Sequence, residues 1–246
     1  IKDENSKHTI ENGVFNVYIS GIDTSGNIRN VSRSDANIVV TVNTNTHEIL
    51  LTSIPRDYYV TLHSKQAKDK LTHSGIYGIN ETVSTVEDLL GIDINYYVRV
   101  NFTSLIDIVD AIGGIEVDNP RAFGEFSQGT IHLNGTQALA FSRERHAFAE
   151  GDKERGRNQM RVITGIINKV ISPSIITNYM SLLNSLHSSF QTNLTDDQMI
   201  SLLRMQINDM SAWNIESISV DGNGNTLYSP IYGSSLYMMV PDDASV

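Results

Sequence analysis

The stretch 36-ANIVVTVNTNTHEILLTSIPRD-57 decides the fold of this chain. Its two halves, residues 36–43 and 48–57, are apolar runs rich in β-branched side chains, and a polar turn separates them. This order predicts an antiparallel hairpin. Because both runs are almost continuously apolar, we expect the hairpin to lie inside a sheet that is covered on both faces.

Strand-like and helix-like segments alternate on both sides of this hairpin. Strands are predicted over residues 14–23, 94–102, 114–118, 213–220 and 234–240, and helices over residues 79–91, 102–114, 134–145, 158–170, 174–190 and from 195 onward. We expect residues 1–13 to be a polar lead-in and residues 119–133 to be an irregular connection. The pattern predicts one α/β domain over residues 1–246, with a central, mostly buried mixed sheet and helices on both faces.

Composition excludes several classes of function. The 246 residues carry a net charge of −10, which argues against a general nucleic-acid binder, because such proteins neutralise phosphates with a basic face. There is no cysteine, so disulfides, thiolate metal sites and cysteine nucleophiles are excluded. No run of 18 or more apolar residues is present, and no Gly-rich nucleotide-binding loop or Gly-x-Ser-x-Gly elbow is found.

Arginines gather in one stretch of this anionic chain, 141-FSRERHAFAEGDKERGRNQMR-161. Five lie here: Arg143, Arg145, Arg155, Arg157 and Arg161. A guanidinium is a planar fork of donors that stays charged and matches phosphate or carboxylate, so the cluster indicates a site for a phosphate-rich group. Acidic residues are interleaved with the arginines, which leaves a salt-bridged helix surface as the alternative.

A second charged group lies at predicted strand ends and comprises Asp23, Arg33, Asp35 and Arg56. Ligand sites of α/β sheets gather at strand ends, where loops can vary without disturbing the core. Two aspartates beside arginines suit a magnesium ion that also contacts phosphate oxygens. The alternative is that Asp23 and Asp35 are ordinary turn residues.

Taken together, these motifs resemble the LytR-CpsA-Psr family. The resemblance rests on several short segments in the same order, and it covers nearly the whole chain: Gly21-Ile22-Asp23, Ser32-Arg33-Ser34-Asp35, Ile54-Pro55-Arg56-Asp57, Ala140-Phe141-Ser142-Arg143-Glu144-Arg145, and Asp152 with Arg155 and Gln159. Within the family, the streptococcal capsule-associated CpsA-type members look most similar.

The resemblance implies a phosphotransferase on the outer face of the Gram-positive cell membrane. Such an enzyme moves a capsular or teichoic-acid-like polymer from a polyprenyl-pyrophosphate carrier to peptidoglycan, and we expect a membrane anchor to precede Ile1. Asp23 and Asp35 would hold Mg²⁺. Asp152 would orient arginines or lie near the attacking group, and Arg56, Arg143 and Asp152 would be catalytic. The pyrophosphate would be bound by Arg33, Arg56, Arg143, Arg145, Arg155 and Gln159.

The chemistry of the residues agrees with this expectation but leaves alternatives open. Phosphoryl transfer needs positioned cations more than a covalent nucleophile, and its proton acceptor here would be a carboxylate, with Asp23 and Asp35 as candidates. A polyprenyl-pyrophosphate phosphatase would use the same residues. A non-enzymatic, regulatory lipid-phosphate-binding module is the third reading.

Other residues carry weaker signals. We expect Arg161 to face solvent, since it is out of phase with the apolar helix face, and His146 to be an exposed loop residue. A group of apolar residues in the last third of the chain would either line a tunnel for the lipid or pack in an ordinary core: Met180, Leu182, Leu183, Leu186, Met199, Leu202 and Leu203.

Overall fold

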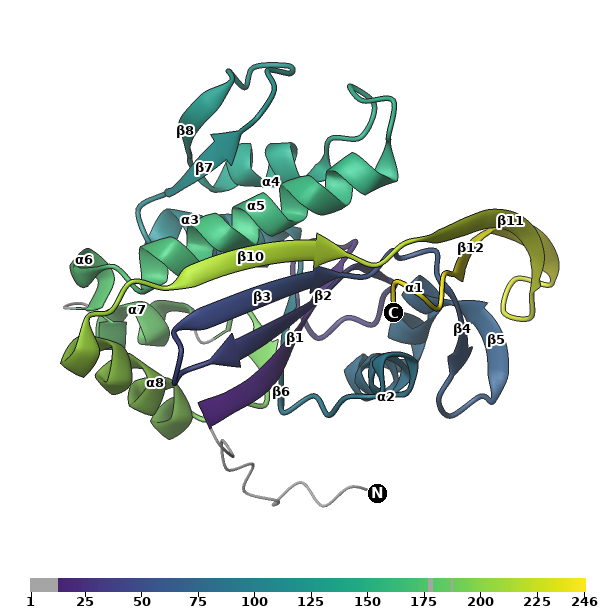
Figure 1. Ribbon diagram of the computed structural model, residues 1–246, viewed down its shortest axis with the longest axis horizontal. Helices are drawn as coiled ribbons and strands as arrows, with labels where there is room; N and C mark the ends of the chain where they lie inside the picture. The colour runs from purple at the N-terminus through teal and green to yellow at the C-terminus, as the bar shows by residue number, and fades with distance from the viewer. Residues whose placement is uncertain (1–12, 177–178, 187) are drawn as a thin grey trace.

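Figure 1 shows the computed structural model, which describes residues 13–176, 179–186 and 188–246. Its centre is a mixed six-stranded sheet with the strand order β10-β3-β2-β1-β6-β9. The neighbours β1–β2, β2–β3 and β6–β9 are antiparallel, whereas β1–β6 and β10–β3 are parallel. The strands are β1 (Val14–Ile22), β2 (Ser34–Asn43), β3 (Glu48–Ser53), β6 (Tyr96–Val100), β9 (Gln191–Thr192) and β10 (Asn214–Ser219).

The predicted hairpin is confirmed and lies in the middle of this sheet. β2 and β3 pair from Ile38 opposite Ser53 to Asn43 opposite Glu48. Successive β2 side chains point to opposite faces, so Val39 joins one buried cluster while Ile38 and Val40 join another. Both faces of the hairpin are therefore covered, as its continuous apolar character predicts.

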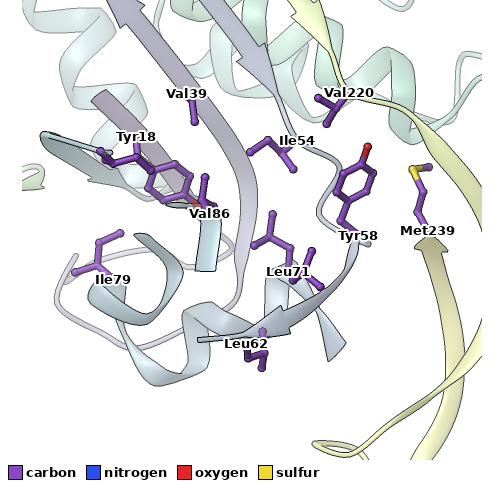
Figure 2. Packing of buried hydrophobic residues seen from close by; sticks show 12 residues of the cluster. Tyr18, Val39, Ile54, Tyr58, Leu62, Leu71, Ile79, Val86, Val220 and Met239 are labelled. Carbon is purple, nitrogen blue, oxygen red and sulfur yellow. The ribbon is translucent and has the colours of Figure 1, made fainter. Parts of the chain in front are cut away.

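On one face, the sheet packs against α2 (Ile79–Leu90) and two small hairpins. Figure 2 shows this core, in which Tyr18 of β1 and Val39 of β2 approach Val86 of α2. α2 ends where Gly91 adopts a left-handed conformation (φ 66°), as predicted. The other covering elements are β4 (Tyr59–Leu62), β5 (Ala67–Lys70), α1 (Leu71–Ser74), the 3₁₀ helix Gly75–Tyr77, β11 (Gly222–Ser229) and β12 (Ser234–Pro241).

On the opposite face, α5 (Asp152–Val170) lies over the sheet and buries Met160 against β2 and β3. A third core lies behind α5 and contains four clustered phenylalanines, among them Phe123 and Phe141. It is formed with α3 (Phe102–Ala111), α4 (Gly135–Arg143), β7 (Ile115–Asn119) and β8 (Gly129–Leu133). The predicted cap of α4 is confirmed, because the Asn134 side chain accepts from the backbone N–H of Gln137.

Three further helices follow α5 in the chain: α6 (Pro173–Ile176), α7 (Tyr179–Leu186) and α8 (Asp196–Asp209) (Figure 1). The predicted helix over residues 174–190 is thus two helices in the described residues. The capping box at the start of α8, formed by Thr195 and Gln198, is confirmed. None of the helices within the described part of the chain has both the length and the apolar character needed to cross a membrane.

Two further predictions of local structure are wrong. The expected irregular connection over residues 119–133 contains β8, whose Leu133 faces the third core opposite Ile115. The helix predicted from Asn158 begins six residues earlier, at Asp152. Its first turn carries Asp152 and Glu154, which favour the positive end of the helix dipole, so this charged stretch is helix and not loop.

Candidate phosphate-binding site

The charged residues at the strand ends meet at one end of the central sheet. β2 begins beside the point where β3 ends, so Asp35 lies next to Arg56, which follows Pro55. The Nη1 atom of Arg56 donates to Oδ2 of Asp35 over 3.2 Å. The first turns of α5 arrive at the same end, where Gly156 lies against Ser53 of β3. The sheet thus brings residues from β2, β3 and α5 together.

Asp152, at the start of α5, is the carboxylate around which the arginines gather. Its Oδ2 accepts from Arg56 Nε over 3.1 Å and from Arg155 Nη2 over 3.3 Å. The Oδ1 atom lies 3.8 Å from Arg145 Nη1, too far for a hydrogen bond. Three guanidinium groups separated by up to 99 residues in the sequence therefore surround one carboxylate.

Asp35 is held from both sides. Thr72 Oγ1 donates to its Oδ1 over 2.7 Å, while Arg56 donates to its Oδ2. Sequence reasoning missed Thr72, since it lies in a polar stretch, residues 63–78, for which we predicted no element. Residues 71–75 of that stretch are buried, in α1 and at the start of the 3₁₀ helix, so only the fold could place Thr72 beside Asp35.

The two central arginines have different electrostatic environments. Burial opposes the charged form of Arg56, but the nearby carboxylates of Asp152, Asp35 and Asp57 outweigh that effect, and the pKa of Arg56 is raised. Burial lowers the pKa of Arg155, and the positive charge of Arg56 lowers it further. Both groups stay charged at any biological pH. Asp152 and Asp35 raise the pKa of Arg155 but offset these effects only in part, so Arg155 is a mostly buried cation that an anionic ligand would stabilise.

These residues line an open pocket of about 510 Å³. The predicted site residues on its wall are Asp35, Arg56, Asp152, Arg155 and Gln159. Its wall also includes the end of β10 and two side chains of β12. The pocket is large enough for a phosphorylated sugar as well as a pyrophosphate.

The remaining predicted residues lie at the same end of the sheet but do not line this pocket. Asp23 follows β1, and its Oδ2 lies 3.7 Å from Arg33 Nη2. Strand pairing of Ile22 with Ser34 places these two side chains beside each other. Arg143, at the end of α4, stacks over the ring of Phe102 at 4.2 Å from the centroid. Phe102 is the first residue of α3, which follows β6 after Asn101, and β6 pairs with β1.

The donor set at Asp23 and Asp35 fits Mg²⁺ only with help from a ligand. No group of three or more His, Asp or Glu side chains suited to a metal occurs among the described residues. Magnesium is usually held by one or two carboxylates, with phosphate oxygens and water completing its octahedron. Two aspartates beside a phosphate-binding arginine cluster have that composition.

Comparison with known proteins agrees with this geometry. The sequence profile of the LytR_cpsA_psr family matches residues 1–244. The chain belongs to the LytR-CpsA-Psr family. A polyisoprenyl-teichoic acid–peptidoglycan teichoic acid transferase TagU from Bacillus cereus is 34% identical over 253 residues, covering 99% of this chain and 81% of that protein. The TagU of Enterococcus faecalis is 39% identical over 75% of this chain and 63% of its own length.

Solved structures show the same family fold. The crystal structure of Bacillus subtilis TagV superposes with a TM-score of 0.79 at 30% identity, covering 96% of this chain and 93% of that one. A structure described as TagT bound to LI-WTA gives a TM-score of 0.74 at 30% identity, with 95% and 86% coverage. The TagU relatives carry teichoic acid transfer in their names, whereas the motifs had suggested the capsule-associated members.

Two arginines of the 141–161 stretch line the pocket but are paired with a carboxylate of their own helix. Arg157 and Arg161 each donate to a different oxygen of buried Glu154 over 2.7 Å, and Arg161 also donates to Asn158. The prediction that Arg161 faces solvent is therefore wrong: its side chain is only 24% exposed, because it reaches back along α5 to Glu154. His146 is exposed, as predicted, and accepts from Arg145 Nε over 3.3 Å.

The apolar residues of the last third have mixed environments. Leu183 and Met199 line a second pocket of about 540 Å³, between α7, α8 and the loop that follows β1. Leu182 instead packs against the third core, and Leu186 is buried. The side chain of Met180 lies outside the described residues. The lipid tunnel that the family resemblance implies stays a prediction.

Proposed function

We propose that this LytR-CpsA-Psr chain is a phosphotransferase that moves a teichoic-acid-like polymer from a polyprenyl-pyrophosphate carrier to peptidoglycan. The single observation that carries the proposal is Arg56, fixed between Asp35 and Asp152 and joined by Arg155 and Arg145 at an open pocket. Cations held in place before the substrate arrives stabilise the charge that develops during phosphoryl transfer. The TagU relatives support teichoic acid over capsular polysaccharide as the polymer.

The reaction breaks one bond of the pyrophosphate. A hydroxyl oxygen of peptidoglycan attacks the phosphorus that carries the polymer, and the bond from that phosphorus to the bridging oxygen breaks. The electron pair of that bond leaves with polyprenyl monophosphate, and the polymer becomes joined to peptidoglycan through a phosphodiester. The hydroxyl proton passes to a carboxylate of the pocket. Asp152 Oδ1 is suitably placed, because the hydrogen bonds from Arg56 and Arg155 go to Oδ2 and Arg145 Nη1 lies 3.8 Å from Oδ1, beyond hydrogen-bond range.

Different arginines bind different parts of the pyrophosphate. Arg56 and Arg155 bind the phosphoryl group under attack from the pocket side, with Gln159 beside them on the wall. Arg33, Arg143 and Arg145 bind the rest of the pyrophosphate from the β1 and α4 side. Asp152 holds Arg56 and Arg155 in position. Asp23 and Asp35 would hold Mg²⁺, which supplies further charge neutralisation at the phosphate oxygens.

The substrates set the location. Polyprenyl carriers lie in membranes and peptidoglycan lies outside them, so the enzyme acts at the outer face of the cell membrane, tethered by an anchor segment beyond this chain. The same site could bind a lipid phosphate without turnover, or could use water as the acceptor. Turnover with a peptidoglycan acceptor separates these possibilities.

The test combines lipid analysis with turnover. Mass spectrometry of lipids extracted from the folded wild-type protein should detect a polyprenyl phosphate or pyrophosphate that Arg56→Ala lacks. Incubation with a polyprenyl-pyrophosphate-linked donor and peptidoglycan fragments should then yield a phosphodiester-linked product. Arg56→Ala should lower kcat on the order of 10²- to 10³-fold, as loss of an oxyanion donor does. Donor cleavage only to the free phosphorylated polymer would identify a phosphatase, and lipid binding without any cleavage would identify a binding module.

A further inference from the structure

The pocket extends beyond the phosphate-binding arginines. On one side lie Asp35, Arg56, Asp152, Arg155 and Gln159. The opposite side, which we call the β10–β12 half, is formed by Ser217, Ser219 and Asp221 at the end of β10 together with Tyr237 and Met239 of β12. In Figure 1, β10 leads directly into the β11–β12 hairpin at this end of the sheet. The two halves share one cavity, so a molecule in the β10–β12 half reaches the phosphate site.

We propose that the β10–β12 half binds the saccharide acceptor, the peptidoglycan glycan whose hydroxyl attacks the phosphorus. This inference rests on the proposed transferase function and adds to it where the second substrate lies. Three features carry it: the charge balance of this half, the placement of Tyr237, and the direction from which the hydroxyl must approach.

The β10–β12 half is almost charge-balanced. Lys153 Nζ lies 2.8 Å from Asp221 Oδ1, so these two charges offset each other. Arg157 and Arg161 also line the pocket and share the single carboxylate of Glu154, which leaves one positive charge uncompensated. A polyanionic polymer needs uncompensated cations, whereas an uncharged sugar needs hydroxyl, amide and carboxylate partners. The serines of β10 and the Lys153–Asp221 pair offer the second kind of surface.

Tyr237 places an aromatic ring at the wall of the pocket. Its side chain is 54% exposed although it lines the pocket. The ring lies over Gly224 of the paired strand, where a Cβ atom would come within 2.8 Å of it, so glycine at this position lets the ring rest against the backbone. An aromatic ring combines a large apolar face with a polar hydroxyl, which suits the C–H face and the hydroxyl edge of a pyranose.

The direction of attack favours the acceptor at this place. The attacking and leaving oxygens lie roughly in line on opposite sides of the phosphorus. Asp23, Arg33 and Arg143 lie at the same end of the sheet but do not line the pocket. If they bind the departing lipid phosphate, the hydroxyl must enter from the opposite side, which is the β10–β12 half.

The experiment compares Tyr237→Ala with Tyr228→Ala in the full chain. Tyr228 is a matched control: it is 59% exposed on the same hairpin but does not line the pocket. Transfer from a polyprenyl-pyrophosphate-linked donor to soluble peptidoglycan fragments is measured while each substrate is varied. Tyr237→Ala should raise the KM for the fragments on the order of tenfold, equivalent to about 1.4 kcal/mol. Its KM for the donor and its rate of donor hydrolysis should match those of wild type. Tyr237→Phe, which keeps the aromatic ring, should have a KM for the fragments close to that of wild type.

Calorimetric titration of the same fragments into wild type and both variants tests the inference without turnover. Weakened binding by Tyr237→Ala alone supports it. An unchanged fragment KM and affinity would overturn it, and so would a rise in the donor KM, which would place the donor's own sugars in the β10–β12 half. If the wild-type protein binds the fragments through Tyr237 but never transfers polymer, the proposed function is overturned. The binding site for the fragments would still be supported.

Discussion

At the scale of single residues, Arg56 has a role that another cation cannot fill. Its guanidinium donates from Nη1 to Asp35 and from Nε to Asp152, so two edges of one planar group join β2 to α5. A lysine ammonium is a point charge on a flexible stem and cannot hold both carboxylates in fixed directions. The geometry of the site therefore depends on the shape of this cation as well as its charge.

We expect Arg56→Lys to lose most of the activity while the protein stays folded. The kcat for polymer transfer should fall on the order of 10²-fold, because one oriented donor to the phosphate is lost. Arg121→Lys is the matched control, since Arg121 is 52% exposed and lies outside the pocket. Transfer by Arg56→Lys at wild-type rate would show that charge alone suffices.

Glu154 should make stability depend on pH in the acid range. Burial disfavours its charged form, but hydrogen bonds from Arg161 and Arg157 outweigh burial, and its pKa is lowered from the ordinary value of 4.5. A carboxyl with a lowered pKa in the folded state stabilises the protein above the unfolded-state pKa. That contribution is lost as the pH falls through the folded-state pKa.

Urea unfolding of wild type and Glu154→Gln between pH 7 and pH 3 checks this. At pH 7 the variant should be less stable by about 2 kcal/mol, the typical strength of a hydrogen bond to a charged group. The difference should shrink as the pH falls below 4.5, because wild type then loses the same charge. A difference that stays constant across the range would mean that Glu154 stabilises through packing.

At the scale of elements, the junction between β6 and α3 holds the loop that carries Asp23 and Arg33. Buried Arg99 donates from Nη1 to the carbonyl of Ile28 over 3.0 Å and from Nη2 to the carbonyl of Asn30 over 2.9 Å. Asn101 donates to the carbonyl of Gly26. Arg99 and Asn101 thus hold the loop in place through hydrogen bonds to its backbone, although neither residue lines the pocket.

Replacing Arg99 should therefore loosen the loop. Arg99→Met leaves two carbonyls without a donor, which costs about 1–3 kcal/mol for each buried group. Hydrogen exchange of the loop amides should accelerate, and the KM for the donor should rise more than kcat falls. Arg204→Met on exposed α8 is the control. If the loop amides of Arg99→Met exchange at the wild-type rate, the loop keeps its conformation without the hydrogen bonds from Arg99.

Element type was predictable where apolar periodicity was strong, as in the 36–57 hairpin and α2. It failed where charge hid the pattern. The first turns of α5, residues 152–157, read as a loop because five of these six residues are charged, yet Glu154 pairs with Arg157 and Arg161 along the helix. The arginine cluster itself was visible in the sequence, but the sequence could not show that Arg157 and Arg161 pair with Glu154 while Arg155 contacts Asp152.

At the scale of the whole molecule, one buried carboxylate ties the β11–β12 hairpin to the middle of the chain. Asp69 is 1% exposed; its Oδ1 lies 2.7 Å from His73 Nδ1, and its Oδ2 accepts from Ser229 Oγ over 2.8 Å. The backbone N–H of Ile231 also donates to Asp69. Residues 160 positions apart are thereby fixed together, and with them the wall that carries Tyr237.

Ser229→Ala should weaken this tie. The lost donor leaves a buried carboxylate oxygen with one partner fewer, and the free energy of unfolding should fall by about 1–3 kcal/mol. Ser234→Ala is the control, because Ser234 pairs with Ser229 across the hairpin but is exposed. Equal stability of the two variants in urea unfolding would show that the apolar contacts of Met239 alone hold the hairpin.

The sequence predicted the layered α/β architecture, because that depends on apolar runs of each element. It could not predict long-range polar contacts such as Asp69 with Ser229 or Thr72 with Asp35, because they exist only once distant elements pack. For the same reason it predicted that the charged residues lie at the strand ends, where the structure has them, but not which residues form the pocket's second wall.

The parallel pairing of β10 with β3 also has a consequence in time. Residues 214–219 complete a sheet whose neighbouring strand, residues 48–53, was synthesised more than 160 residues earlier. Until β10 arrives, β3 presents an open edge, and closing so long a loop makes late docking slow. A newly made chain therefore passes through a stage that is vulnerable to misassembly, and we expect a folding helper to shorten that stage.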